Sequence, residues 1–172
     1  MAEREAHSKT NIKKLSDQIE VLKEQARNKG LAFHALTTKE LEKRLKSSHT
    51  PFIYTRSWSS RNSSTSSFYY SITVYNPDPN YYANLCVYFF FSPADMIVDI
   101  DTALLSADQR LYRGFKQFPY IASDSSSTVE FNYKFPTDLP LGLYIGNSFI
   151  FDRDNPGANS YKDRASIDVE IF

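Results

Sequence analysis

The sequence predicts a mainly β protein, an antiparallel β-sandwich of seven or eight strands preceded by two N-terminal α-helices. The first observation is a change of period, because apolar residues recur every three or four positions before Pro51 and every second position after it. The second is the clean alternation of apolar and polar side chains in segments 127–135 and 165–171. Such alternation is typical of antiparallel strands that bury one face and expose the other.

The first helix is expected from residue 11 to residue 29. Ile12, Leu15, Ile19 and Leu22 are separated by three, four and three positions, which is a heptad pattern. The pattern covers only about two and a half heptads, and a helix of this length is marginally stable alone. Two alternatives therefore stay open: the helix oligomerises, with a dimer favoured, or it docks on the strand domain of its own chain.

A second helix is expected to begin at Thr37. Gly30 supplies the positive φ that ends the first helix at low cost. Thr37 and Glu40 have the spacing of a capping box, and Leu36 and Leu41 occupy the two positions of a hydrophobic staple. The chain is therefore divided into a helical segment, residues 1–50, and a sandwich domain, residues 51–172.

The sandwich domain contains short strands separated by turn-forming sequences. Strands are predicted at 52–57, 68–75, 83–92, 96–100, 110–115, 127–135, 143–152 and 165–171. Turn residues lie between strands at 76–80, 92–93, 123–127 and 153–160. This number of strands in about 120 residues is typical of a β-sandwich. Strands and helices do not alternate, which argues against a nucleotide-binding α/β fold.

The strand at residues 85–91 is apolar on both faces and must be covered on both. One face packs against the opposite sheet. The other face requires the N-terminal helices, a loop or another subunit as its cover. We expect Cys86, Tyr88 and Phe90 on this face to be covered by the N-terminal helices or by a partner subunit. Leu36, Leu41 and Leu45 are the expected intramolecular cover.

The charge balance argues against nucleic-acid binding. Residues 1–50 carry 11 basic and 7 acidic side chains, and residues 51–172 carry 9 and 13. A nucleic-acid surface would need a strongly basic domain. The first residues lack the apolar core of a signal peptide, and no apolar run approaches the length of a membrane span. We expect no nucleic-acid or membrane partner, and a location in the cytoplasm or outside the cell by signal-independent export.

Catalytic motifs are not found in the sequence. His7, His34 and His49 all precede the sandwich, so the domain has no histidine to serve as a base for a nucleophile. Cys86, the only cysteine, lies in an apolar strand, where a thiol is inert. No phosphate-binding glycine loop or zinc-protease motif appears. We expect no enzymatic activity and no cofactor.

Four oxygen-bearing residues near the C-terminus are candidate calcium ligands: Asp152, Asp154, Asn155 and Asp163. Calcium is bound by several oxygen ligands, which these side chains could supply. The strict loop spacing of known calcium motifs is absent, and Arg153 lies among them. Ordinary polar turn residues are the favoured interpretation.

Four aromatic residues are the candidate binding residues: Trp58, Tyr75, Tyr81 and Tyr82. All lie in or beside predicted loops rather than in the middle of strands. An exposed aromatic ring offers a flat apolar face with a polar tip, which suits protein contacts and sugar rings. The alternative is that Tyr81 and Tyr82 fold back and cap the core.

Part of the sandwich domain resembles a known family. Asn76–Pro77, the segment Leu139–Gly142 and Tyr144 are similar in type to turns of the immunoglobulin-like sandwiches of bacterial surface and adhesion proteins, of the CARDB kind. The resemblance covers about residues 65–172 and implies an immunoglobulin-like fold. Domains of this kind mostly bind carbohydrate or protein, although a fold alone does not assign a function.

The expected function is a non-enzymatic assembly or protein-interaction module. It would oligomerise or dock through its N-terminal helix and bind a partner through the sandwich loops. The alternative is a carbohydrate- or calcium-binding β-sandwich module.

Overall fold

The computed structural model describes residues 2–47, 50–64, 67–96, 101, 103, 108, 111–135, 139–153 and 161–172, with side chains from residue 10 onward. Two helices and nine strands follow one another along this part of the chain. They are α1 (Ala2–Asn28), β1 (Ala32–Ala35), α2 (Thr38–Ser47), β2 (Phe52–Trp58), β3 (Arg61–Asn62), β4 (Ser67–Asn76), β5 (Leu85–Pro93), β6 (Tyr112–Gln117), β7 (Ser125–Lys134), β8 (Gly142–Asp152) and β9 (Asp163–Ile171).

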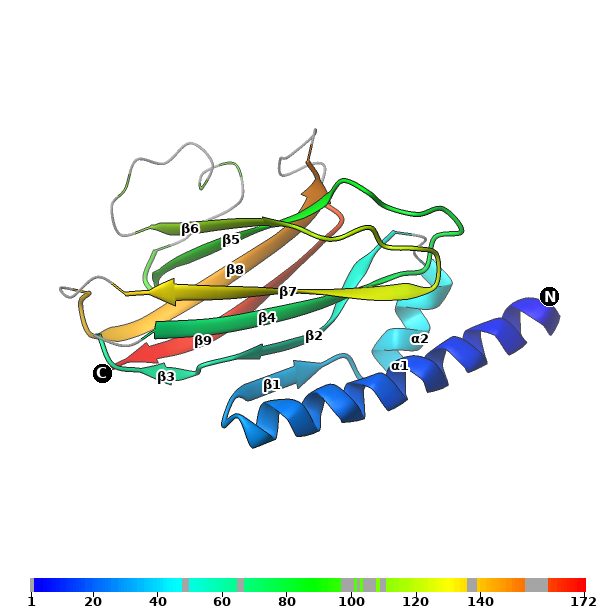
Figure 1. Cartoon of the computed structure of the whole chain (residues 1–172), viewed down its shortest axis with the longest axis horizontal. Coiled ribbons are helices and arrows are strands. Elements are labelled where there is room, and N and C mark those ends of the chain that lie inside the picture. The colour runs from blue at the N-terminus through cyan, green and yellow to red at the C-terminus, as the bar shows by residue number, and fades with distance from the viewer. Residues whose placement is uncertain are drawn as a thin grey trace.

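The strands form two sheets that pack face to face (Figure 1). Sheet 1 has the order β1-β2-β4-β7, and sheet 2 has the order β3-β9-β8-β5-β6. Neighbouring strands are antiparallel except for the short pair β3 and β9, which is parallel. The predicted mainly β sandwich after two helices is confirmed. The predicted strand at 96–100 lies largely outside the described residues, and residue 96 is in a turn.

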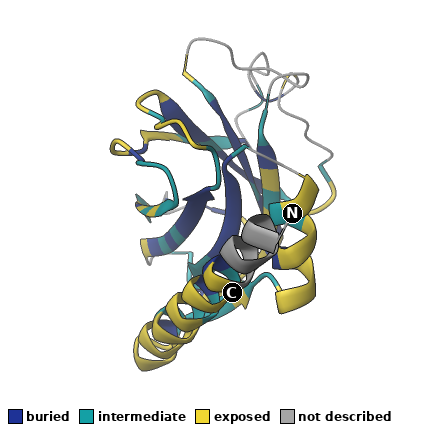
Figure 2. Cartoon of the chain, turned by 90° about the vertical axis from the view of Figure 1, so that its right-hand side faces the viewer, coloured by how far each residue is buried: buried dark blue, intermediate teal, exposed yellow. Residues whose placement is uncertain are grey.

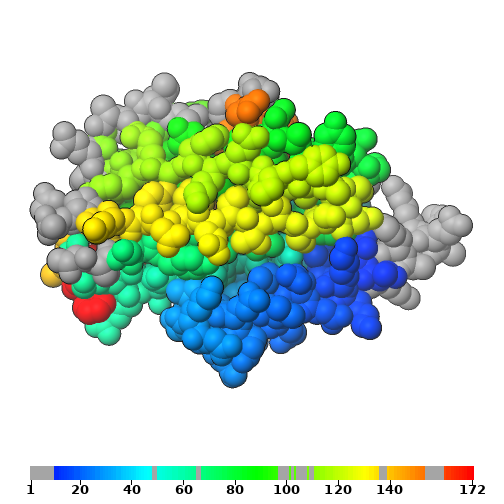
Figure 3. All heavy atoms as spheres, in the orientation of Figure 1, coloured from blue at the N-terminus to red at the C-terminus, as the bar shows by residue number. Residues whose placement is uncertain are grey.

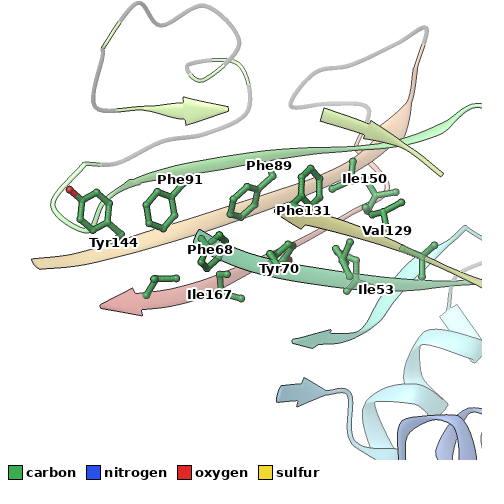
Figure 4. Packing of buried hydrophobic residues seen from close by; sticks show 14 of the residues in the cluster. Ile53, Phe68, Tyr70, Phe89, Phe91, Val129, Phe131, Tyr144, Ile150 and Ile167 are labelled. Carbon is green, nitrogen blue, oxygen red and sulfur yellow. The ribbon is translucent and has the colours of Figure 1, made fainter. Parts of the chain in front are cut away.

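Aromatic side chains fill the space between the two sheets (Figure 4). Phe68 and Tyr70 of sheet 1 face Phe89 of sheet 2, and the rings of Tyr70 and Phe89 stack with centroids 4.8 Å apart. All three side chains are at most 1% exposed. Burial of each such side chain contributes about 1.5–3 kcal/mol, so this layer is a main source of stability. The alternation of apolar residues in the sequence therefore indicates the core correctly.

The helices cover the outer face of sheet 1. Leu15 of α1 and Leu41 of α2 form a buried cluster with Phe52, Tyr54 and Tyr75, and Ile19, Leu22, Leu36 and Leu45 pack against it. We call this group the helix cluster. In Figure 2 the helices present exposed residues to solvent, with buried strands behind them. The helical segment also supplies β1, which pairs with β2 and was not predicted.

The local signals that begin α2 are present as predicted. The backbone N–H of Thr37 donates to Glu40 Oε1 (3.1 Å), and the backbone N–H of Glu40 donates to Thr37 Oγ1 (3.2 Å). These reciprocal bonds make a capping box. Gly30 has a φ of 67°, so it occupies the left-handed region after α1. No helix in the described residues is long and apolar enough to span a membrane.

The predicted cover of Cys86, Tyr88 and Phe90 is wrong. These side chains lie on the outer face of sheet 2 with Phe149 and Phe151, and they are covered by Met96, Ala103, Leu111 and Tyr161. The reason lies in the topology, because β1 joins the helices to sheet 1 and places them on the opposite side of the molecule. Leu36, Leu41 and Leu45 do form an intramolecular cover, but they cover sheet 1.

Candidate binding surface

Two neighbouring loops lie at one end of the sandwich, which we call the loop end. Residues 77–84 connect β4 to β5, and residues 118–124 connect β6 to β7. Asn76 and Ser125 are paired across β4 and β7, so one loop begins beside the point where the other stops. Both loops lie at the right-hand end in Figure 1, and their residues form part of the surface there in Figure 3.

Asn76 holds the two loops together. Its side chain is completely buried, and its Nδ2 donates to the carbonyl oxygens of Asn80 (2.9 Å), Ala122 (3.2 Å) and Ile121 (3.3 Å). Its Oδ1 accepts the backbone N–H of Asp78 (2.9 Å), which is an Asx turn. One buried amide therefore satisfies polar groups of both loops, and buried polar groups without partners would be costly.

Further hydrogen bonds fix the loop that follows Asn76. Asp78 Oδ1 accepts the backbone N–H of Asn80 (2.9 Å), and Asp78 Oδ2 accepts the hydroxyl of Tyr82 (3.0 Å). The backbones of Tyr82 and Ile121 exchange two N–H···O bonds of 2.9 Å. Burial, with the bond to Asp78, raises the pKa of Tyr82 to about 12. Its hydroxyl therefore stays a hydrogen-bond donor at neutral pH.

Helix α1 supports the second loop. Lys14 Nζ donates to the carbonyl oxygen of Asp124 (2.8 Å), and the Tyr75 hydroxyl donates to Asp124 Oδ1 (2.9 Å). Asp124 has a φ of 55°, a left-handed conformation that aspartate tolerates better than most residues. The loop end is therefore attached to the helices as well as to the sheets.

Tyr81 and Tyr120 project from these two loops as a pair, which we call the tyrosine pair. The two side chains are 61% and 62% exposed. Their ring centroids are 4.9 Å apart with a tilt of 31° between the planes. Stacked or tilted rings at this distance attract one another. The result is a two-ring apolar block on a hydrogen-bonded base.

The four predicted binding residues have different outcomes. Tyr81 is exposed as the binding hypothesis requires, and its neighbour Tyr82 is half-buried. The placement of Tyr75 in an exposed position is wrong, because its ring is buried against Phe52 beneath the helices. Trp58 packs against the core, and its Nε1 donates to the carbonyl oxygen of Asp168 (3.0 Å). Trp58 lies at the opposite end of β2 from the loop end.

The sequence pattern does not indicate Tyr120 as a binding residue. The signal that could have indicated it is its position in Phe118–Ile121, where a proline precedes a tyrosine outside the alternating strands. Phe118 and Ile121 are buried in the core, so the loop is held on both sides of Tyr120. A residue between two such attachments is directed outward unless something covers it.

The residues predicted to mediate oligomerisation pack against other residues of the same chain. Leu15 is 1% exposed in the helix cluster, Ile19 and Leu22 pack against this cluster, and Ile12 is half-buried. Docking on the sandwich, one of the two alternatives left by the sequence, is therefore the arrangement in the single chain. Three of the four heptad residues, Leu15, Ile19 and Leu22, thus lie in or against the helix cluster that joins α2 to sheet 1.

The calcium candidates do not form a site in the described residues. Asp163 is buried, and its oxygens accept N–H groups from Ile53 (2.8 Å), Arg164 (2.9 Å) and the Arg44 side chain (3.3 Å). Asp152 is paired with Lys162 at 3.6 Å. Asp154 and Asn155 lie outside the described residues. In the described ranges, no three His, Cys, Asp or Glu side chains lie close enough to hold a metal ion.

Calcium is expected to leave the melting temperature of the protein unchanged. A ligand that binds only the native state raises its stability, so calcium binding would appear as a higher melting temperature. The measurement compares thermal unfolding in millimolar calcium and in a chelator. A rise of several degrees that is lost in Asp154→Ala would contradict this expectation.

Comparisons with known proteins identify the fold. No family model and no curated protein matches the chain. The C-terminal domain of wzt is similar in structure, with a TM-score of 0.52 and 10% identity over 83% of this chain and 78% of that one. A CARDB domain from Pyrococcus furiosus gives a TM-score of 0.44 and 13% identity over 71% of this chain and 90% of that one. A Paenibacillus cycloisomaltooligosaccharide glucanotransferase gives 0.42 and 11% over 65% of this chain but 12% of that enzyme.

These similarities are all at the level of the fold, because each identity is far below 25%. The protein has an immunoglobulin-like β-sandwich with two helices before it. The weak resemblance to CARDB domains that the sequence predicts is confirmed.

Proposed function

We propose that the protein is a non-enzymatic interaction module that binds a partner protein through the tyrosine pair at its loop end. The observation that carries this proposal is the contact of two rings, 4.9 Å apart, that are 61% and 62% exposed. Tyrosine is enriched among the few interface residues that contribute most of a binding energy. The more apolar area of a ring is exposed to water, the more favourable the free energy of burying that ring against a partner.

The rigidity of the loop end supports binding. Association costs free energy when loops and side chains become ordered at an interface. Asn76, Asp78 and Ser123 already hold both loops with hydrogen bonds in the free protein. Less conformational entropy remains to be lost when a partner arrives, so more of the contact energy appears as affinity.

A protein partner agrees better with this surface than a sugar does. Each ring of the tyrosine pair covers part of one face of the other ring. The surface that stays accessible to a partner is therefore the outer side of the pair. A sugar also needs hydrogen-bond partners for its hydroxyls beside the stacking ring. Asp78, a carboxylate in the same loop as Tyr81, already accepts bonds on both oxygens. A protein pocket lined with apolar side chains can accept the block without such partners.

The docked helices act as a structural support in this proposal. Their apolar side chains stabilise sheet 1, and Lys14 anchors the loop before β7. Docking through the N-terminal helix and binding through the loops are thus two parts of one module.

Site-specific photo-crosslinking tests the proposal. A photoreactive phenylalanine at position 120 is expected to form an adduct with one protein in the cells that make this chain. The matched control is the same group at position 172, because Phe172 is 50% exposed and lies at the other end of the molecule (Figure 1). We expect the adduct at 120 to be lost in Tyr81→Ala.

Two outcomes would contradict the proposal. Equal labelling from positions 120 and 172 would show that contact at the loop end is not specific. A glycan instead of a peptide in the adduct would assign the surface to carbohydrate, which is the alternative function.

A further inference from the structure

A polar cavity of about 220 Å³ lies at the side of the sandwich, where β9 of sheet 2 contacts β2 of sheet 1. Residues of β1, α2, β2 and β9 line it, and none of them belongs to the loop end. Its ionisable lining residues are His34, Glu40, Arg44, Tyr54, Arg56, Asp163 and Arg164.

Arg56 points into the sandwich although it is charged. It is paired in register with Ile72, a core residue on the inner face of sheet 1, and with His34 of β1 on its other side. Its Nη1 donates to the carbonyl oxygen of Ser166 across the gap between the sheets. Burial is the main cause that lowers the pKa of Arg56, so its guanidinium has lost part of its hydration.

Among the described residues, most hydrogen-bond donors of Arg56 have no protein acceptor. A guanidinium has five N–H donors in a fixed fork. Within the part of the chain that the structure describes, the carbonyl oxygen of Ser166 is the one acceptor bonded to Arg56. A partly desolvated donor without an acceptor is costly, so these donors require water or a ligand from the cavity.

The acidic residues of the cavity accept hydrogen bonds from groups other than Arg56. Both side-chain oxygens of Asp163 accept N–H groups. One of the donors is the side chain of Arg44, and this ion pair has an N···O distance of 3.3 Å. Glu40 Oε1 accepts the backbone N–H of Thr37 in the capping box. Arg164 leans over the ring of Phe149, with its guanidinium carbon 5.5 Å from the ring centroid. The lining thus has three arginines against two carboxylates, and within the described residues Arg44 alone among these arginines has a carboxylate bonded to its side chain.

We propose that this cavity binds a small oxyanion, a carboxylate or phosphate group that accepts parallel N–H bonds from Arg56. The planar fork of arginine matches the oxygen atoms of both groups in a bidentate arrangement. His34, next to Arg56, supplies a second polar contact at the cavity wall. Burial and the neighbouring Arg56 lower the pKa of His34, so its ring is neutral at pH 7 and hydrogen-bonds without adding charge. This site does not depend on the function of the loop end.

An NMR titration of the full chain tests the site. Sodium phosphate and sodium acetate are added in separate series, with sodium chloride at equal ionic strength as the reference. We expect a saturable shift of the Arg56 side-chain signal and of the His34 ring signals with phosphate, acetate or both. A response to phosphate alone assigns a phosphate group, and a response to acetate alone assigns a carboxylate. No shift beyond that of chloride would overturn the proposal.

Two variants and a control make the test specific. Arg56→Gln is expected to abolish the saturable response. Glu40→Gln is expected to tighten binding several-fold, because it removes a negative charge from the cavity while glutamine still serves in a capping box. Arg61→Gln is the control, since Arg61 is exposed and stacks on Phe172 at 4.1 Å, away from the cavity. Should Arg56→Gln fail to fold, an unchanged affinity in Glu40→Gln would by itself overturn the proposal.

Discussion

Replacing Leu41 by Ala is expected to lower the free energy of unfolding by about 2–5 kcal/mol, the usual cost of removing a large side chain from a packed core. Leu41 is completely buried in the helix cluster, where it joins Leu15 to Tyr54 and Tyr75. The α2 helix has only 10 residues, and a helix of that length has little stability without such packing. The substitution therefore weakens the docking of both helices.

Urea denaturation followed by circular dichroism measures this loss. Val21→Ala is the matched control, because Val21 lies on α1 but is 50% exposed. An exposed substitution of this kind is expected to change stability by no more than about 0.5 kcal/mol. If Leu41→Ala were as stable as Val21→Ala, the helices would not be an integral part of the fold.

Local signals in the sequence predict the elements well. The capping box of Thr37 and Glu40 begins α2, and Gly30 follows the end of α1, because these features depend on residues within one turn of each other. The alternation in 127–135 predicts β7 for a similar reason, since neighbouring residues on a strand face opposite ways.

Relations between distant segments were predicted less well. The sequence indicates that residues 85–91 need two covers, but it does not show which segment supplies the second one. Met96 and Leu111 cover Phe90, while the helices cover Tyr75 on the other sheet. The face that the helices cover depends on β1, which joins them to sheet 1. This strand has four residues and is too short to give an alternating pattern in the sequence.

The candidate site shows the same limit. Tyr81 follows Asn76–Asn80, a turn rich in proline and asparagine that predicts a projecting loop. Its partner Tyr120 is far along the chain, and only the pairing of β4 with β7 brings the two loops together. The inward position of Arg56 was also not predicted, because a single charged residue in a strand indicates the solvent face.

The tyrosine pair is expected to contribute most of the binding energy of the partner captured at position 120. Tyr81→Ala and Tyr120→Ala should each raise the dissociation constant by about 30-fold, or roughly 2 kcal/mol, the threshold of an interface hot spot. Both rings are more than 60% exposed, so truncation removes contact area without opening a cavity in the core.

The most direct test is a double-mutant cycle measured by isothermal titration calorimetry with that partner. Because the two rings contact each other at 4.9 Å, their effects are coupled, and the double variant should lose less affinity than the two single losses combined. Phe172→Ala is the control and should bind like the unaltered protein. If Tyr81→Ala and Tyr120→Ala both bind within about twofold of the unaltered protein, a change below 0.5 kcal/mol, the tyrosine pair is not the binding surface.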